Sequence, residues 1–203
     1  MPVLHKFKYL KKNRDFKANG NEVLLKAKKA LDEIGINFWL DYGTLLGVYR
    51  DGKLISYDTD VDVGVFLDDY TENIIKALEK NGFVYERKII VDQGRYAMEQ
   101  SFSYLNVKID IFYYRKEGNK MISHLFPLND KKKYTVREIY TTYSDFTSID
   151  FLKQSFSIPK NTEQRLQETY GEDWRIPISD WYTPDDALNS KIIDKNCQEI
   201  KNR

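Results

Sequence analysis

The segment Asp60–Phe66 constrains the fold of this chain more than any other, because it alternates carboxylates with apolar residues. Successive side chains of an extended strand point to opposite faces, so Asp60 and Asp62 leave the same face about 6.5 Å apart at the backbone. The valines on the other face predict that the strand is anchored in a core. Carboxylates held this close repel each other unless a cation or a proton lies between them. The alternation therefore predicts a strand that presents a divalent-cation site.

A third carboxylate, Asp110, lies in the run Val107–Tyr113, which is rich in β-branched and aromatic residues and is typical of a strand. A lone carboxylate in such a strand is costly unless it has a partner. We therefore expect Asp60, Asp62 and Asp110 to form one site, as catalytic residues and as ligands of Mg²⁺ or Mn²⁺. Mg²⁺ prefers oxygen ligands and completes its shell with substrate phosphate. Asp110 is expected to share the metal or to accept a proton from an attacking hydroxyl.

A candidate phosphate-binding turn precedes these strands. Residues 41–47 read Asp-Tyr-Gly-Thr-Leu-Leu-Gly, and a short helix over 44–50 is predicted after the Gly43–Thr44 break. The first backbone amides of a helix are unpaired and attract anions, so Gly43 and Thr44 are expected to bind substrate phosphate. Arg50, at the other end of this helix, has two interpretations. It is either a planar clamp on a donor pyrophosphate or a surface residue favoured by the helix dipole.

The remaining sequence alternates helices with strands. Helices are predicted over residues 22–34, 71–81 and 162–170, and strands over 36–41, 60–66, 83–90, 96–102 and 107–114. This order predicts an α+β (α/β) fold with a central mixed sheet flanked by helices. After Gly171, an aromatic stretch punctuated by prolines predicts an irregular C-terminal extension that wraps over the core. No linker or repeat interrupts the chain, so residues 1–203 are expected to form a single domain.

Composition limits the partners and the compartment. The formal net charge is +1, so no nucleic-acid partner is expected, and the lysines near the N-terminus and at 131–133 are interpreted as solvated faces. The single Cys197 excludes an intramolecular disulfide and favours a reducing compartment. No apolar stretch approaches the roughly 20 residues that span a bilayer. We expect a cytoplasmic protein, and peripheral contact with the inner face of the membrane stays open.

The acidic segment has two other interpretations. Asp58, Asp60 and Asp62 have the opening spacing of an EF-hand calcium loop, but that loop needs Gly where Val63 stands and Glu where Asp69 stands. A solvated acidic turn is the usual meaning of clustered charges. The Gly-Thr turn and the carboxylate in a second strand make both readings weaker than a cation site. His124, before an apolar segment, is interpreted as structural.

Several motifs occur in an order that resembles the LicD and fukutin family of the nucleotidyltransferase-fold superfamily. The signature of that family is similar to residues 41–50 and 56–62, and its second acidic motif to residues 108–112. Similarity continues through residues 125–128 and 158–159 to a C-terminal pattern, and covers about residues 22–182 in all. The resemblance implies a nucleotidyltransferase-like fold, and it places Gly43, Thr44, Arg50 and Asp58 among the substrate-binding residues. Tyr57, Thr59 and Tyr49–Asp51 depart from the family pattern.

The resemblance also implies an activity. LicD-type phosphotransferases transfer a phospho-alcohol, such as phosphocholine or ribitol phosphate, from a CDP-linked donor to a hydroxyl of a cell-surface glycan or lipid-linked saccharide, and release CMP. Capsule or lipopolysaccharide modification is the expected context, with Mg²⁺ as cofactor. The alternatives are a true nucleotidyltransferase, which releases pyrophosphate, and a non-catalytic accessory binding protein of glycan assembly. The alcohol, the acceptor and the oligomeric state stay open.

Overall fold

The computed structural model describes residues 3–202 of the chain, and their side chains from residue 9 onward. Its longer helices and its strands follow one another along the chain in the order α1 (Val3–Asp32), β1 (Trp39–Leu40), α2 (Tyr42–Asp51), β2 (Asp60–Phe66), α3 (Asn73–Lys80), β3 (Val84–Val91), β4 (Ala97–Tyr104), β5 (Val107–Glu117), β6 (Lys120–Leu125), β7 (Val136–Thr142), β8 (Phe146–Phe151), β9 (Gln154–Pro159), α4 (Thr162–Tyr170), α5 (Thr183–Asp186), β10 (Ser190–Ile193) and β11 (Gln198–Lys201). The expected mixture of helices and strands is confirmed.

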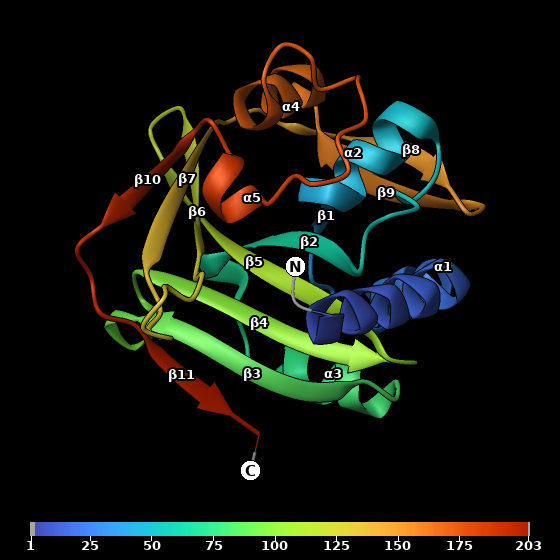
Figure 1. The fold of residues 1–203 in the computed structure, drawn as a ribbon, viewed down its shortest axis with the longest axis horizontal. Helices are drawn as coiled ribbons and strands as arrows, with labels where there is room; N and C mark the ends of the chain where they lie inside the picture. Colours follow the sequence, from blue (N-terminus) through green and yellow to red (C-terminus); the bar gives the residue numbers. More distant parts are fainter. Residues whose placement is uncertain (1–2, 203) are drawn as a thin grey trace.

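Nine of these strands form one sheet. Seven of them follow the order β10-β7-β6-β5-β4-β3-β11, while β2 pairs with β5 and β1 pairs with β2. The sheet is mixed, because β2 runs parallel to β5 while the other pairs are antiparallel. The strands β8 and β9 form a separate hairpin. Figure 1 shows the long sheet curling around, with α1 on one side and α2, α4 and α5 toward its upper rim.

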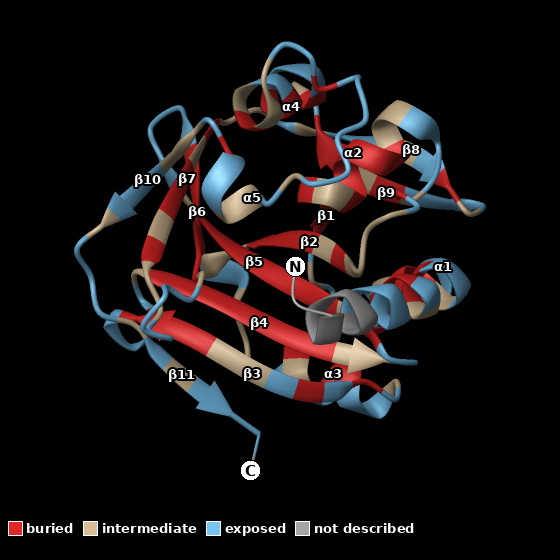
Figure 2. Ribbon diagram, viewed as in Figure 1, coloured by how far each residue is buried: buried red, intermediate tan, exposed pale blue. Residues whose placement is uncertain are grey.

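The C-terminal segment is more regular than expected, because it supplies both edges of this sheet. Strand β10 pairs with β7 at one edge, and β11 pairs with β3 at the other. Only residues 194–197 join the two strands, so the edges of the curled sheet must lie close together. Both strands are mostly exposed, whereas β4 and β5 are buried over much of their length (Figure 2). The expected irregular extension is therefore wrong for residues 190–201.

The alternation in β2 places the apolar side chains where the sequence predicts. Val61, Val63 and Val65 are all fully buried in the main core, with the alternate residues Ile109 and Ile111 of β5. Helix α1 covers this face through apolar side chains from Phe16 to Leu31. The carboxylates of β2 therefore lie on the opposite face of the sheet, where a second and smaller apolar cluster packs.

Two element boundaries differ from expectation for physical reasons. Helix α1 begins at Val3, far before the predicted start at residue 22, because Asn13 and Phe16 are buried and extend its packed face. The strand predicted over 36–41 shrinks to β1, since Asp41 leaves the strand to cap α2. None of the described helices combines the length and the apolar character that a bilayer crossing requires.

Candidate active site

The parallel pairing of β2 with β5 brings the predicted carboxylates together. In this register Asp62 stands opposite Asp110, and Asp60 stands opposite Lys108. Residues opposite each other in a sheet send their side chains to the same face and lie within interaction distance. Asp60 and Asp62 are partly buried, and Asp110 is buried. The structure therefore places all three predicted catalytic carboxylates on one face of one strand pair.

The predicted Gly43–Thr44 break is not observed, because Asp41 caps α2 and the helix begins at Tyr42. The first turn of α2, called the Gly43 turn below, closes over the same carboxylates. A Cβ atom built on Gly43 would lie 2.5 Å from Oδ2 of Asp58 and 3.6 Å from Oδ2 of Asp62. Real Cβ atoms do not approach an oxygen as closely as the first distance, so a side chain at residue 43 would have to displace Asp58. Gly43, Asp58 and Asp62 thus meet at one point, at the start of α2. Glycine is needed here for close approach.

Helix α1 fixes the loop that carries Asp58. The buried side-chain amide of Asn13 donates to the backbone carbonyls of Ser56 and Asp58, each at 2.8 Å. The hydroxyl of Tyr9 donates to the carbonyl of Tyr57 at 2.6 Å. These contacts come from the part of α1 that the sequence did not predict as helical. They hold the Asp58 loop against the end of β2.

The side chain of Thr44 lies beside Asp62 and binds its backbone. Its side chain is 2% exposed, and its hydroxyl oxygen accepts from the backbone N–H of Asp62 at 2.9 Å. The backbone N–H of Asp41 donates to the carbonyl of Asp62 at 3.1 Å. The start of α2 is therefore fastened to β2 on both sides of Asp62. Thr44 positions the turn relative to the carboxylate.

A buried ion pair between Asp41 and Arg165 stabilises the start of α2. One oxygen of Asp41 accepts from the backbone N–H of Tyr42 at 2.9 Å and pairs with the guanidinium of Arg165 at 2.7 Å. Arg165 also donates to the hydroxyls of Thr141 and Tyr114, at 2.7 Å and 2.6 Å. It reaches this position from α4, so the pair ties α4, α2, β5 and β7 together. Asp41 and Arg165 are both buried. They position the start of α2 and are not exposed at the surface of the site.

The carboxylate face is strongly acidic, and burial makes this costly. Burial, with the neighbouring Asp60, raises the pKa of Asp58 to about 8. Burial followed by the charges of Asp60 and Asp58 raises the pKa of Asp62 well above its usual range. For Asp60, burial raises the pKa, Lys108 opposes this and Asp110 adds to it. A site that disfavours its own ionised carboxylates favours a bound proton or cation.

Asp110 is held by two neighbours on the same face. Its Oδ1 accepts from the hydroxyl of Ser101 on β4 at 2.6 Å, and its Oδ2 pairs with Nζ of Lys108 at 2.6 Å. Burial alone would lower the pKa of Lys108, but Asp110, Asp60 and Glu99 outweigh it and raise that pKa above its usual value. Lys108 is therefore a cationic member of the site.

The donor set suits a hard divalent cation, because Asp58, Asp60, Asp62 and Asp110 offer carboxylate oxygens. Oδ2 of Asp58 and Oδ2 of Asp62 both lie against Gly43 at the start of α2. In the described residues, however, no three His, Cys, Asp or Glu side chains are already arranged closely enough to hold a metal ion. The residues thus fit the chemistry of Mg²⁺, and metal binding requires side-chain movement.

Arg50 is the predicted site residue that the structure does not bring to the carboxylates. Its guanidinium pairs with Asp51 at 2.9 Å and donates to the backbone carbonyl of Trp174 at 3.3 Å. Arg50 lies at the far end of α2 from Gly43, about 10 Å along the helix axis. In this arrangement it fastens the end of α2 to the segment after α4, and its role in binding the donor stays a prediction.

Sequence reasoning missed several residues of the site. Tyr170 of α4 packs against Trp181, with ring centroids 5.0 Å apart. Its pKa is raised well above its usual value, first by burial and then by the charges of Asp62 and Asp58. Lys108 was detectable from the sequence, since it alternates with Asp110 and must share its face. Ser101 and Tyr170 depend on strand register and on helix packing.

Three other expectations can be compared with the structure. An EF-hand loop starting at Asp58 is excluded, because Asp60–Phe66 is a strand. His124 is completely buried, as expected of a structural residue, and burial lowers its pKa to about 4. Trp174 is 5% exposed and belongs to the main core, so this part of the aromatic stretch after Gly171 packs over the core as expected.

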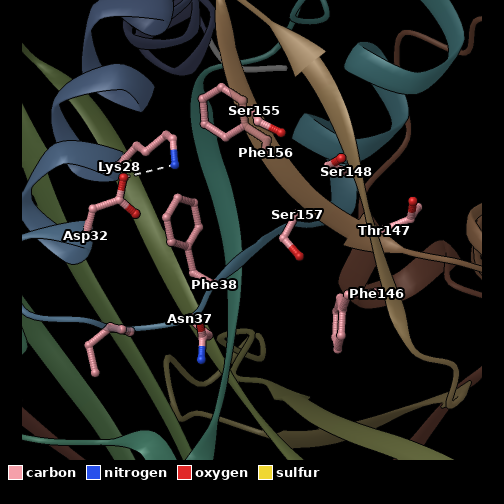
Figure 3. Close-up of a pocket in the computed structure, with 11 residues that line it drawn as sticks. Lys28, Asp32, Asn37, Phe38, Phe146, Thr147, Ser148, Ser155, Phe156 and Ser157 are labelled. Atoms are coloured by element: carbon pink, nitrogen blue, oxygen red, sulfur yellow. Dashed lines mark hydrogen bonds and ion pairs between the residues drawn. The ribbon is translucent and has the colours of Figure 1, made fainter.

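A cleft of about 380 Å³ lies on another part of the molecule, between α1 and the β8–β9 hairpin (Figure 3). Its walls include Phe38 and Phe156 with several hydroxyl side chains, and one wall carries the Lys28–Asp32 ion pair at 2.9 Å. None of the acidic residues of the site lines this cleft. The cleft is therefore separate from the carboxylate face.

Comparison with known proteins identifies the family of the chain. Residues 35–161, which contain β1, α2, β2 and β5, match the family described as LicD/FKTN/FKRP, nucleotidyltransferase domain. The chain belongs to this family, which defines it as a LicD-type protein.

Its relatives include ribitol-5-phosphate transferase FKTN of Mus musculus, 32% identical over 173 residues, which cover 82% of this chain and 35% of the relative. Ribitol 5-phosphate transferase FKRP of Homo sapiens is 35% identical over 92 residues, or 42% of this chain and 18% of the relative. An uncharacterised protein of Caenorhabditis elegans is 27% identical over 192 residues, or 89% of this chain and 48% of the relative. The chain thus spans about a third of the length of FKTN.

Proposed function

We propose that this chain is a Mg²⁺-dependent phosphotransferase of the LicD type. It would transfer a phospho-alcohol from a CDP-linked donor to a hydroxyl of a glycan or lipid-linked saccharide. The observation that carries the proposal is the shared face of β2 and β5, on which Asp60, Asp62 and Asp110 stand beside the Gly43 turn. The names of FKTN and FKRP favour ribitol 5-phosphate as the transferred group, with phosphocholine as the alternative.

The balance of the reaction defines what the residues must do. The hydroxyl oxygen of the acceptor attacks the phosphorus that bears the alcohol, a new P–O bond forms, and the P–O bond to CMP breaks. The proton of the hydroxyl must go to a base, and CMP leaves with the electron pair of the broken bond. Mg²⁺ or Mn²⁺ bound by Asp60, Asp62 and Asp110 would neutralise charge on the phosphorus and lower the pKa of the hydroxyl.

The Gly43 turn would hold the phosphates of the donor. Without a side chain at residue 43, the backbone at the start of α2 can approach a ligand that lies against Asp58 and Asp62. The start of a helix also provides backbone N–H groups and a favourable dipole for anions. Thr44 keeps this turn in place through its contact with the backbone of Asp62. Substrate would therefore bind between α2 and the carboxylate face.

Asp110 is the proposed proton acceptor as well as a metal ligand. Ser101 donates to one of its oxygens, which orients the carboxylate on the face that it shares with Asp60 and Asp62. A positioned base contributes about 10²–10⁴-fold to such a transfer.

Two rival functions use the same residues differently. A true nucleotidyltransferase would direct the attack to the phosphorus next to the nucleoside of a triphosphate and release pyrophosphate. An accessory binding protein would need no reactive cluster, and the buried carboxylates with raised pKa values favour catalysis over it. We also propose that the protein acts in the cytoplasm, at the inner face of the membrane. Its acceptor would be a capsule or lipopolysaccharide glycan.

Product analysis separates these functions. The chain would be incubated with CDP-ribitol or CDP-choline, Mg²⁺ and a panel of saccharides, and in parallel with CTP, and the nucleotide products would be resolved by ion-exchange chromatography. We expect CMP from a CDP-linked donor, and no CMP from Asp62→Asn. Pyrophosphate from CTP would instead identify a nucleotidyltransferase. Binding of the donor without turnover would identify an accessory protein.

A further inference from the structure

Lys108 places a positive charge where the proposed metal has to bind. Its backbone lies opposite Asp60, and its Nζ atom lies 2.6 Å from Oδ2 of Asp110. Because Lys108 and Asp110 are two residues apart in β5, both side chains leave the carboxylate face of the strand. The lysine side chain is 31% exposed, so its ammonium has room to move toward solvent.

Each oxygen of Asp110 already has a partner. Ser101 donates to Oδ1, and Nζ of Lys108 contacts Oδ2. A divalent cation that binds Asp110 together with Asp60 and Asp62 would lie close to the ammonium, and like charges repel strongly at such distances. The cation and the Lys108–Asp110 contact therefore compete for the same carboxylate.

We propose that Lys108 is an internal countercation that holds Asp110 until the donor binds. The phosphates of the donor then draw its ammonium away from Asp110, and the divalent cation takes its place. This inference rests on the proposed function. Lysine suits the role because it is a compact charge on a flexible four-carbon stem, whereas arginine would hold a carboxylate through a rigid fork.

The exchange makes two binding events depend on each other. Without donor, Lys108 weakens metal binding, and with donor it becomes a ligand for phosphate. Binding of donor and metal is then coupled, and by linkage each raises the affinity of the other to the same degree. A metal ion that contacts donor phosphate also produces coupling, so the decisive quantity is the affinity for metal in the absence of donor.

The test is a titration with Mn²⁺, followed by electron paramagnetic resonance of the free ion, with and without CDP. The variant is Lys108→Met, which keeps most of the stem and removes the ammonium. We expect Lys108→Met to bind Mn²⁺ alone at least tenfold more tightly than wild type and to bind CDP at least tenfold more weakly. Lys191→Met, on the exposed strand β10, removes the same charge away from the site and should leave both affinities unchanged.

Unchanged or weaker binding of Mn²⁺ by Lys108→Met would overturn the inference and leave the proposed function intact. If wild type binds no Mn²⁺ even with CDP, both fail, because the metal site itself is then absent. Lys108→Arg keeps the charge and should retain the weak metal affinity of wild type. Thermal melting would check that the variants are folded, and Lys108→Gln serves as the neutral variant should Lys108→Met not fold.

Discussion

Replacement of Arg165 by methionine should destabilise the whole protein, although Arg165 is remote from the carboxylates in sequence. The guanidinium is almost fully buried and pairs with Asp41 at 2.7 Å. The second oxygen of Asp41 has no hydrogen-bond partner among the described residues, so Arg165 provides the neutralising charge. Methionine fills a similar volume but leaves this carboxylate buried and uncompensated.

The expected cost follows from this burial. Removal of one partner of a buried ion pair costs about 3–5 kcal/mol, because the other charge is left without compensation. For a chain of about 200 residues, each kcal/mol shifts the melting temperature by about 2–4 °C, so a fall of roughly 10 °C is expected. The double variant Asp41→Asn/Arg165→Met should recover part of this loss. Asparagine keeps the helix cap on Tyr42 and carries no charge.

Urea denaturation followed by circular dichroism would measure these free energies of unfolding, with the slope m as a check that the unfolded states are comparable. A loss below about 1 kcal/mol in Arg165→Met would refute the reasoning, since it falls in the range of a surface ion pair. Losses that simply add in the double variant would also refute it, because residues in contact should show coupling.

Further predictions concern the carboxylate face. Gly43→Val should abolish binding of CDP in a calorimetric titration, because its Cβ would lie 2.5 Å from Asp58, and unchanged affinity would reduce the turn to a connector. Without metal, folded Asp58, with a pKa of about 8 against an ordinary 3.8, retains a proton that the unfolded chain loses, so this group lowers stability as pH rises from about 4 to 8. His124, whose folded pKa of about 4 keeps it neutral, offsets this loss up to about pH 6.5, so melting temperatures should fall mainly between about pH 6.5 and 8, and Asp58→Asn should flatten that fall. Asp110→Asn should bind Mg²⁺ more weakly and, at saturating metal and donor, reach a rate about 10²-fold below wild type, whereas full recovery would exclude a role as base.

The core of the site was predictable because it depends on local alternation. Asp60 and Asp62 share a face in any strand, and Asp110 lies in a run whose composition favours a strand, so their convergence needed only the pairing of two strands. Helix α4 was predicted with its observed bounds, since its apolar spacing and the following glycine are local signals. The same alternation predicts that Lys108 shares the face of Asp110, but Lys108 was not among the predicted site residues.

The supports of the site were not predictable, since they come from distant parts of the chain. Asn13 holds the Asp58 loop from 45 residues away, and Arg165 reaches Asp41 across 124 residues. Nothing in their neighbouring residues marks these contacts. Strands β6–β11 were also missed, because several are short or carry many polar residues. Strands β10 and β11 pair with β7 and β3, which lie far away in the sequence, so they depend on the sheet that they complete.

The most direct test of the account is a crystal structure of the chain grown with CDP and Mn²⁺, with data collected at a wavelength where manganese scatters anomalously. The account predicts an anomalous peak coordinated by carboxylate oxygens of Asp60, Asp62 and Asp110, at roughly the 2.0–2.2 Å expected for a small hard divalent cation. Phosphate oxygens of CDP should complete the shell beside Gly43. A Mn²⁺ ion bound elsewhere, with CDP in place and these three carboxylates still without a cation, would contradict it.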